Sequence, residues 1–368
     1  MPSTSPPTPD RLTWSLAIAT RNRATALARC LPLAATQTRP PIDVAVCDAS
    51  DDPTPGRDLV DRLRSEHPHI QWTHLPARPG VGHQRNAAWR ATTGDVVFLI
   101  DDDAFMHPDC AEHLMAVYDA DTEQRIASVM ANLDHRAPDE PDVPDAPPPA
   151  ASARRAPSLR DKLVRLVKDV TDIDHPFPPY DGDFPAHDLP ACVRTLGLGT
   201  AKLVHGCRMT VRRSVLEREP FADHVARPGG EDLDSSYRWS RHGLLTTCFA
   251  ARLHHQTTPD DRDALPRRSR FSVLNIVASA AYYAHDRPRG RRITRRYFLR
   301  RSAVSLLHDL KKRDPRLPRT VSAVVGYREA HAAFAQPRDR VWAWHRNAMR
   351  RHHLTGSAAQ PAAAAATA

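Results

Sequence analysis

The sequence lacks any run of apolar residues that approaches the roughly 20 needed to span a membrane as a helix. Residues 1–10 are rich in Pro, Ser and Thr and show no charged stretch followed by an apolar one, so we expect them not to act as an export signal. The six cysteines are scattered and have no paired metal-binding spacing. Several lie in apolar segments, which favours buried, reduced thiols in a cytoplasmic protein.

Acidic residues are scarce where the basic residues concentrate. Residues 267–351 contain 22 Lys and Arg against 5 Asp and Glu, which gives a net charge of +17. Because the whole chain has a net charge of +9, the rest of the chain has a net charge of −8. Such a basic segment requires an anionic partner or a well-solvated surface. It contains no recognised nucleic-acid-binding motif and no run of aromatic residues for base stacking, so we expect no specific nucleic-acid partner.

Short apolar segments alternate with helical ones in the first part of the chain, which is long enough at 368 residues to bury a sizeable core. This alternation predicts a largely parallel sheet with helices on both faces. The expected strands are residues 13–19, 42–47, 70–75, 96–100 and 126–133. The expected helices are residues 24–35, 59–66, a helix that opens at 79–82, and 108–118.

Three of these strands end in polar or acidic residues. Residues 20–23 follow the first strand and residues 48–52 the second, while Asp101, Asp102 and Asp103 follow the strand at 96–100 with no basic residue beside them. A solvated loop would explain the three carboxylates taken alone, but a hard divalent cation also prefers such ligands. Because the carboxyl ends of parallel strands meet at one edge of a sheet, the three loops should converge, which favours a ligand site.

A second acidic group follows two glycines later in the chain. Glu231, Asp232 and Asp234 open a predicted helix. Helix capping explains one acid at such a position more readily than three in four residues. A predicted strand at 244–253 then leads to His254 and His255. Adjacent residues of a strand point to opposite faces, so at most one of the two histidines would normally face a shared site.

Taken in order, these segments resemble the motifs of family 2 glycosyltransferases, which have the GT-A fold. The matching segments are residues 16–23, 46–52, 82–88, 98–103 and 230–234, followed by the histidine pair. They span about residues 13–258 without the Pro-rich stretch between 136 and 190. The second segment departs from the pattern, because it has Cys47 where an acid is common.

The resemblance implies an α/β protein with a Rossmann-like, mostly parallel mixed sheet flanked by helices and a basic helical extension at its C-terminal end. It implies a nucleotide-diphospho-sugar donor and a divalent metal, Mg²⁺ or Mn²⁺. Asp101 and Asp103 would hold this cation together with His254 or His255. The cation would bridge the diphosphate and neutralise charge on the leaving nucleoside diphosphate.

The resemblance also assigns roles in binding and catalysis. The residues implied to contact the nucleotide sugar are Thr20, Arg21, Asp48, Arg85, Asp101 and Asp102. Asp232 would be the general base that takes a proton from an acceptor hydroxyl, with Glu231 as the competing assignment. A single displacement would invert the anomeric configuration, which is the usual outcome in the family, and the enzyme would be a hexosyl- or related transferase. The acceptor type stays open.

Six segments describe the expected domain organisation. Residues 1–10 are a disordered tail, 11–135 the nucleotide-sugar-binding half, and 191–258 the acceptor and catalytic half. Residues 136–190 are a Pro-rich insertion with one amphipathic helix at 159–170 and a lid-like loop at 175–190. Residues 259–353 are basic and helical, and 354–368 are a low-complexity tail. Within 191–258, residues 196–200 read as a flexible loop.

Alternatives remain for both the activity and the basic region. A nucleotidyltransferase acting on a sugar phosphate also pairs carboxylates with a metal on an α/β sheet, and a GT-A scaffold can serve as a non-catalytic binding protein. In the basic region, residues 293–312 form an amphipathic helix whose apolar side includes Leu299, Leu306 and Leu310. This pattern equally suits the anionic cytoplasmic face of a membrane and an ordinary solvated helical cap.

Overall fold

A computed structural model describes residues 11–140, 188–222, 230–256 and 264–352. The chain divides into two compact units. Unit 1 contains residues 1–168 and 184–258, and unit 2 contains residues 169–183 and 259–368. The predicted helix at 159–170, most of the loop at 175–190 and both predicted tails lie outside the described residues.

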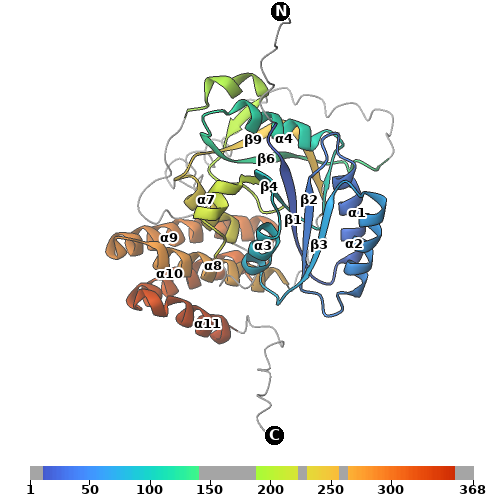
Figure 1. Ribbon diagram of the computed structural model, residues 1–368. Helices are drawn as coiled ribbons and strands as arrows, with labels where there is room; N and C mark the ends of the chain where they lie inside the picture. Colours follow the sequence, from blue (N-terminus) through green and yellow to red (C-terminus); the bar gives the residue numbers. More distant parts are fainter. Residues whose placement is uncertain (1–10, 141–187, 223–229, 257–263, 353–368) are drawn as a thin grey trace, which may run out of the picture. The chain divides into compact units, whose positions relative to one another are not determined.

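Four parallel strands form the first half of the sheet in unit 1, in the order β3 (Gln71–Pro76), β2 (Asp43–Asp48), β1 (Trp14–Thr20) and β4 (Val96–Asp101) (Figure 1). All four strands therefore end at the same edge of the sheet. This arrangement confirms the predicted convergence of the three polar loops, because they directly follow β1, β2 and β4.

Helices cover both faces of this half-sheet, as predicted. Leu16 and Ile18 of β1 pack in one core with helices α1 (Ala24–Ala35), α2 (Thr54–Glu66) and α4 (Cys110–Ala120). Ala17, which points the other way, packs in a second core with α3 (Val81–Arg90), α6 (Arg213–Arg218) and Trp239 of α7 (Glu231–Trp239). The alternation of side chains along a strand thus explains why the strand is buried on both sides.

The second half of the sheet mixes directions. Strand β8 (Arg208–Arg212) lies antiparallel between β4 and β6 (Ile126–Asp134), and β9 (Leu244–His255) then pairs parallel with β6. Two short strands, β5 (Ala104–Met106) and β7 (Leu198–Thr200), pair antiparallel with β9. The mixed α/β sheet agrees with the expected fold class, with its parallel part confined mainly to β1, β2, β3 and β4.

The expected flexible loop at 196–200 is wrong. A 3₁₀ helix, Ala191–Leu196, is followed by β7, whose partner β9 lies about 50 residues further along the chain in the register of Thr200 with Thr246. A Cβ at Gly199 would lie 2.9 Å from the Phe249 ring, so the glycine permits this close pairing. The two glycines suggested a loop, whereas the pairing with β9 is a tertiary contact.

Unit 2 is helical in its described part, as expected for the basic region. Its helices are α8 (Ala264–Tyr283), α9 (Arg287–Lys312), α10 (Pro318–Ala335) and α11 (Val341–Arg351), with a short 3₁₀ helix at Arg338–Arg340. Gly326 of α10 allows close packing, because a Cβ there would lie 2.5 Å from Val273 and 2.7 Å from Phe298. None of the described helices is long and apolar enough to cross a membrane.

The sequence did not reveal which side of α9 packs inward. The buried residues of this helix include Thr294, Phe298, Ser305 and Asp309, whereas most of its leucines are exposed. Asp309 is satisfied inside unit 2, because its carboxylate accepts hydrogen bonds from the backbone N–H and the hydroxyl of Thr320, each at 2.8 Å. The hydrogen-bonded Asp309 therefore occupies a buried position of α9 where the spacing of apolar residues would predict a leucine.

A matched pair of leucines tests how firmly β1 belongs to the core. Leu16 is fully buried in β1, whereas Leu133 at the end of β6 is 46% exposed. Leu16→Ala should lower the free energy of unfolding of the chain by about 2–5 kcal/mol through lost burial and a residual cavity. Leu133→Ala should change it by about 0.5 kcal/mol or less. Equal effects of both substitutions in chemical denaturation would contradict this core.

Candidate active site at the carboxyl edge of the sheet

The three polar loops meet through direct side-chain contacts. The Thr20 hydroxyl donates a 2.6 Å hydrogen bond to Asp102 Oδ2, which joins the end of β1 to the end of β4. The Ala49 N–H donates to the Thr20 carbonyl at 3.0 Å, which joins the ends of β1 and β2. Gln84 of α3, which sequence reasoning missed, lies beneath both strand ends and donates to the Thr20 carbonyl at 2.8 Å. The edge is therefore a preorganised surface.

A cluster of possible metal ligands lies at this edge. Ligand atoms of Asp101, Asp103 and His255 all lie within 4.8 Å of one another. The chain turns after β4 into β5, where Ala104 pairs with His255 of β9, and this pairing places His255 beside Asp103. The side chain of His254 points elsewhere, because its Nδ1 lies 3.1 Å from the Asp134 carbonyl. The structure thus brings His255, and not His254, into the cluster.

One carboxylate oxygen in the cluster is buried without a hydrogen bond. Asp103 Oδ1 accepts none of standard geometry within the described residues, and its partner is His255 Nε2, which lies 3.2 Å away in an ion pair. A metal ion that replaced the proton of His255 would satisfy the same oxygen. Two carboxylates and one imidazole suit a divalent transition metal such as Mn²⁺. The residues present therefore fit a cation held by Asp101, Asp103 and His255.

The neighbours of the acidic triplet give its members different acidities. Burial raises the pKa of Asp102 to about 6, although the hydrogen bond from Thr20 and the charge of Arg23 oppose this rise. Burial acts in the same direction on Asp103, but His255 and Arg23 outweigh it and lower the pKa of that carboxyl group. Asp103 is therefore ionised at neutral pH, as a metal ligand must be.

Arg23 was missed in the sequence because it lies about 80 residues from the acids that it neutralises. Its guanidinium pairs with Asp102 at 3.0 Å and also with Asp103. His255 supplies further positive charge, since Asp103 and Cys207 raise its pKa to about 10. A bound cation would replace the proton of His255. The triplet thus has cationic neighbours in space that it lacks in the sequence.

Arg85 of α3 connects the acidic triplet to the second acidic group. Its side chain is 5% exposed and lies 3.0 Å from Asp101 Oδ1 and 3.2 Å from Glu231 Oε1. It also donates to the Gly206 carbonyl at 3.2 Å, and a Cβ on Gly206 would lie 2.7 Å from the guanidinium. The predicted contact of Arg85 with a nucleotide stays a prediction, but the side chain already holds two acids from distant segments in place.

The two catalytic candidates at the start of α7 have different surroundings. Gly230, with a φ of 98°, turns the chain into the helix. Glu231 is buried and paired with Arg85. Asp232 is half-buried and accepts hydrogen bonds from the Leu233 N–H at 2.9 Å and the Gly206 N–H at 3.4 Å. Burial raises the pKa of Asp232 above its ordinary value, while the charge of Arg85 opposes the rise.

The third acid of this group has a structural partner. Asp234 is fully buried and its carboxylate pairs with Arg238, one turn further along α7, at 2.9 Å. Arg238 in turn pairs with Glu219 at 2.9 Å. Asp234 therefore pairs within its own helix, whereas Glu231 pairs with Arg85 of α3 and Asp232 accepts hydrogen bonds from backbone N–H groups.

Asp48 and His74 form a second polar arrangement at the end of β2. Asp48 Oδ1 accepts a hydrogen bond from the Ser50 N–H at 2.8 Å, and its Oδ2 lies 3.3 Å from His74 Nε2. Gly56 permits this position of Asp48, since a Cβ there would lie 2.6 Å from Oδ2. Arg21 lies apart from Asp48 in an exposed ion pair with Asp51 at 3.2 Å. His74 carried no sequence signal, because a lone histidine in a strand is unremarkable.

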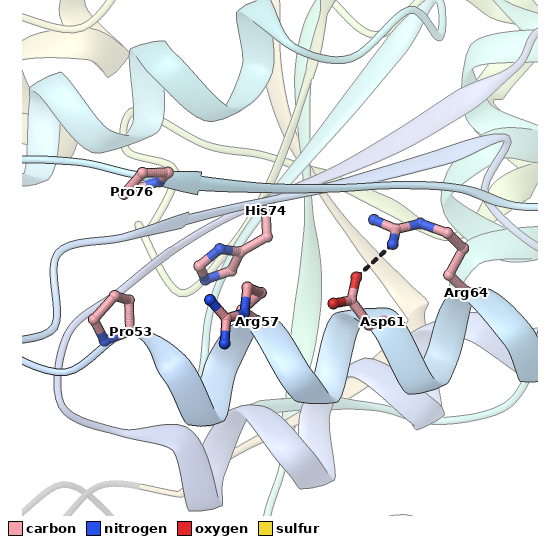
Figure 2. Close-up of a pocket in the computed structure, with 6 residues that line it drawn as sticks. All are labelled: Pro53, Arg57, Asp61, Arg64, His74 and Pro76. Atoms are coloured by element: carbon pink, nitrogen blue, oxygen red, sulfur yellow. Dashed lines mark hydrogen bonds and ion pairs between the residues drawn. The ribbon is translucent and has the colours of Figure 1, made fainter.

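A pocket of about 310 Å³ lies between α2 and β3, beside His74 (Figure 2). Its lining residues are Pro53, Arg57, Asp61, Arg64, His74 and Pro76. Arg64 pairs with Asp61 across the pocket wall. None of these residues belongs to the carboxylate cluster, so the pocket is not part of the candidate cation site.

Comparisons with known proteins bear on the family and on the fold. Residues 15–159 match the sequence model of the family described as Glycosyl transferase family 2, which covers less than half of the chain. No curated protein matches the chain in sequence. The match includes Thr20, Asp48, Arg85 and the acidic triplet.

Two solved structures share the fold. A mannosyltransferase, PcManGT from Pyrobaculum calidifontis, in complex with GDP-Man and Mn²⁺, is 17% identical with a TM-score of 0.50, over 94% of this chain and 83% of that one. GalNAc-T7 with UDP, GalNAc and Mn²⁺ is 14% identical with a TM-score of 0.51, over 94% of this chain and 58% of that one. The chain thus spans little more than half of GalNAc-T7. The fold is the GT-A glycosyltransferase fold that the sequence resemblance implied.

Two arginines of this edge allow a matched test of the buried ion pairs. Arg85→Met removes the cation that balances Glu231 and Asp101, and should lower the free energy of unfolding by about 3–5 kcal/mol. Arg21→Met removes an exposed pair, with side chains 42% and 75% exposed, and should cost about 1 kcal/mol or less. Adding Glu231→Gln to Arg85→Met should recover part of the loss. Similar denaturation curves for the two single variants would show that Arg85 does not stabilise the site.

Proposed function

We propose that this chain, whose residues 15–159 match the model of glycosyltransferase family 2, transfers a sugar from a nucleotide-diphospho-sugar to an acceptor hydroxyl with inversion. The observation that carries the proposal is the cluster of Asp101, Asp103 and His255, joined through Arg85 to Glu231 of α7. The reaction belongs to the hexosyl- or related transferases.

On the donor side, Asp101, Asp103 and His255 hold a divalent cation. When bound, this cation neutralises the diphosphate and stabilises the leaving nucleoside diphosphate. The imidazole ligand favours Mn²⁺ over Mg²⁺, because Mg²⁺ strongly prefers oxygen ligands. Both structural neighbours described above were solved with Mn²⁺. Thr20, Arg21 and the Asp48 carboxylate line the adjoining strand ends and contact the nucleotide.

On the acceptor side, Asp232 acts as the general base. It takes the proton from the acceptor hydroxyl while the hydroxyl oxygen bonds to the anomeric carbon and the bond from that carbon to the diphosphate breaks. A carboxylate with a raised pKa is a stronger base, and burial raises the pKa of Asp232. Glu231 is less suited, because its carboxylate is committed to Arg85 at 3.2 Å. One displacement on one face of the sugar inverts its configuration.

The cysteines support a cytoplasmic location for this activity. All six are free, and Cys30, Cys47, Cys110 and Cys248 are buried. Reduced thiols are the normal state in the cytoplasm. The acceptor carries a hydroxyl group.

Metal-dependent donor binding provides the first test. Nucleoside diphosphates and sugar nucleotides are screened for thermal stabilisation with and without Mn²⁺. Ligands that carry one particular nucleobase should stabilise the chain by about 2.7 kcal/mol at a concentration near 100 times their Kd. This stabilisation should require the metal. Asp103→Asn should abolish the effect, whereas Asp58→Asn on the outer face of α2 should retain it. Metal-independent stabilisation, or none from any member, would refute the donor site, and pyrophosphate release from a nucleoside triphosphate would favour a nucleotidyltransferase.

The isosteric variants Asp232→Asn and Glu231→Gln test the base. Release of nucleoside diphosphate from the donor identified above is the readout, because water can replace an unidentified acceptor. Asp232→Asn should lower kcat by about 10²–10⁴-fold with donor binding unchanged, since it removes proton transfer alone. Glu231→Gln should have the smaller effect on kcat. The reverse order would assign the base to Glu231, and unchanged kcat in both variants would exclude this mechanism.

A further inference from the structure

The outward face of α9 carries basic and apolar side chains and no acidic one. Exposed residues recur every three or four positions along the helix, so they form a single stripe. We define the α9 stripe by its large members, which are Arg289, Arg292, Arg296, Leu299, Arg300, Leu306, Leu307 and Leu310. The one acid within α9 is Asp309, which is 2% exposed and bonded to Thr320.

The two ends of the α9 stripe differ in character. Its first half is made mainly of arginines, and its second half is made of leucines. Leu299, Leu307 and Leu310 are 60%, 55% and 58% exposed. Such a contiguous row of leucines is unusual on a surface that has no partner. Exposed Lys311 and Lys312 follow directly, so cations flank the leucines at both ends.

We propose that the α9 stripe docks on the surface of a lipid bilayer that contains anionic lipid. The leucines would enter the boundary between headgroups and acyl chains, while the arginines and lysines contact the anionic headgroups. The net charge of +17 on residues 267–351 complements such a surface over the whole region. This proposal concerns unit 2 alone and does not depend on the chemistry proposed for Asp101 and Asp232.

The charge pattern disfavours the other occupants of this face. A second copy of the chain, packed antiparallel about a two-fold axis, would place the arginine half of each stripe against the leucine half of the other, which leaves the arginines without an anionic partner. A nucleic acid would contact the arginines but would leave the leucines in water. An anionic bilayer satisfies both halves of the stripe at once.

Vesicle sedimentation with the full-length chain tests the proposal. The chain should bind vesicles of phosphatidylcholine mixed with phosphatidylglycerol at least about tenfold more tightly than vesicles of phosphatidylcholine alone, and salt should weaken this binding. Leu307→Asp combined with Leu310→Asp should abolish it. The matched control Leu133→Asp, at a leucine that is 46% exposed in unit 1, should bind as the wild type does.

A charge-reversal pair separates the electrostatic part. Arg292→Glu with Arg296→Glu should weaken binding to the anionic vesicles, whereas Arg57→Glu with Arg62→Glu should not, although the two arginines of α2 are each 57% exposed. Circular dichroism and the donor-dependent thermal shift should stay unchanged in all variants, which separates lost docking from lost folding or lost donor binding.

Three results would overturn the proposal. The first is absence of binding to the anionic vesicles at low salt, and the second is binding that the leucine substitutions leave intact. The third is that the chain does not bind vesicles and instead forms a concentration-dependent dimer in analytical ultracentrifugation, which the same leucine substitutions abolish. That last result would assign the α9 stripe to a second copy of the chain.

Discussion

The burial of several carboxylates at one edge of the sheet is the constraint on which the rest of unit 1 depends. Asp102, Asp103 and Glu231 are each almost inaccessible to solvent, and a buried charge without a partner is strongly unfavourable. The chain meets this cost with cations from three distant segments: Arg23 after β1, Arg85 on α3 and His255 at the end of β9. Asp103 Oδ1 has His255 as its ion-pair partner at 3.2 Å, and Asp101, Asp103 and His255 together form the cluster of possible metal ligands.

Arg85 gives this arrangement its rigidity. It holds Asp101, a candidate metal ligand, and Glu231, the neighbour of the candidate base, through one planar group that is itself buried. Gly206 lets the guanidinium approach the backbone, and the same residue donates its N–H to Asp232. A transfer reaction needs donor and acceptor groups in fixed relative positions, and a shared buried arginine is a direct way to obtain this. The proposed metal ligands and the proposed base therefore belong to one hydrogen-bonded assembly rather than to two independent sites.

Unit 2 follows a different logic. Its helices bury an apolar interior that includes Val273, Leu274 and Phe298, and Gly326 lets Phe298 approach closely. Polar contacts also lie inside the unit, such as Asn275 with His345, whose Nε2 lies 2.9 Å from the Asn275 side-chain oxygen. The buried positions of α9 are mostly small or polar, and its leucines lie on the outside beside a row of arginines. A contiguous group of exposed leucines is uncommon on a surface that has no partner.

The sequence by itself determined the alternation of strands and helices, the convergence of the polar strand ends and the positions of the acidic groups, because these depend on local periodicity and on the geometry of parallel strands. It also placed Asp101, Asp103 and a histidine in one site through the family resemblance. Only the tertiary structure decided that His255 rather than His254 faces the acids, since this depends on the register of β5 with β9. It also decided that Arg23, Gln84 and His74 support the site, that residues 198–200 form a strand, and that the leucines of α9 face outward. Each of these outcomes rests on contacts between residues far apart in the chain, which no local pattern records.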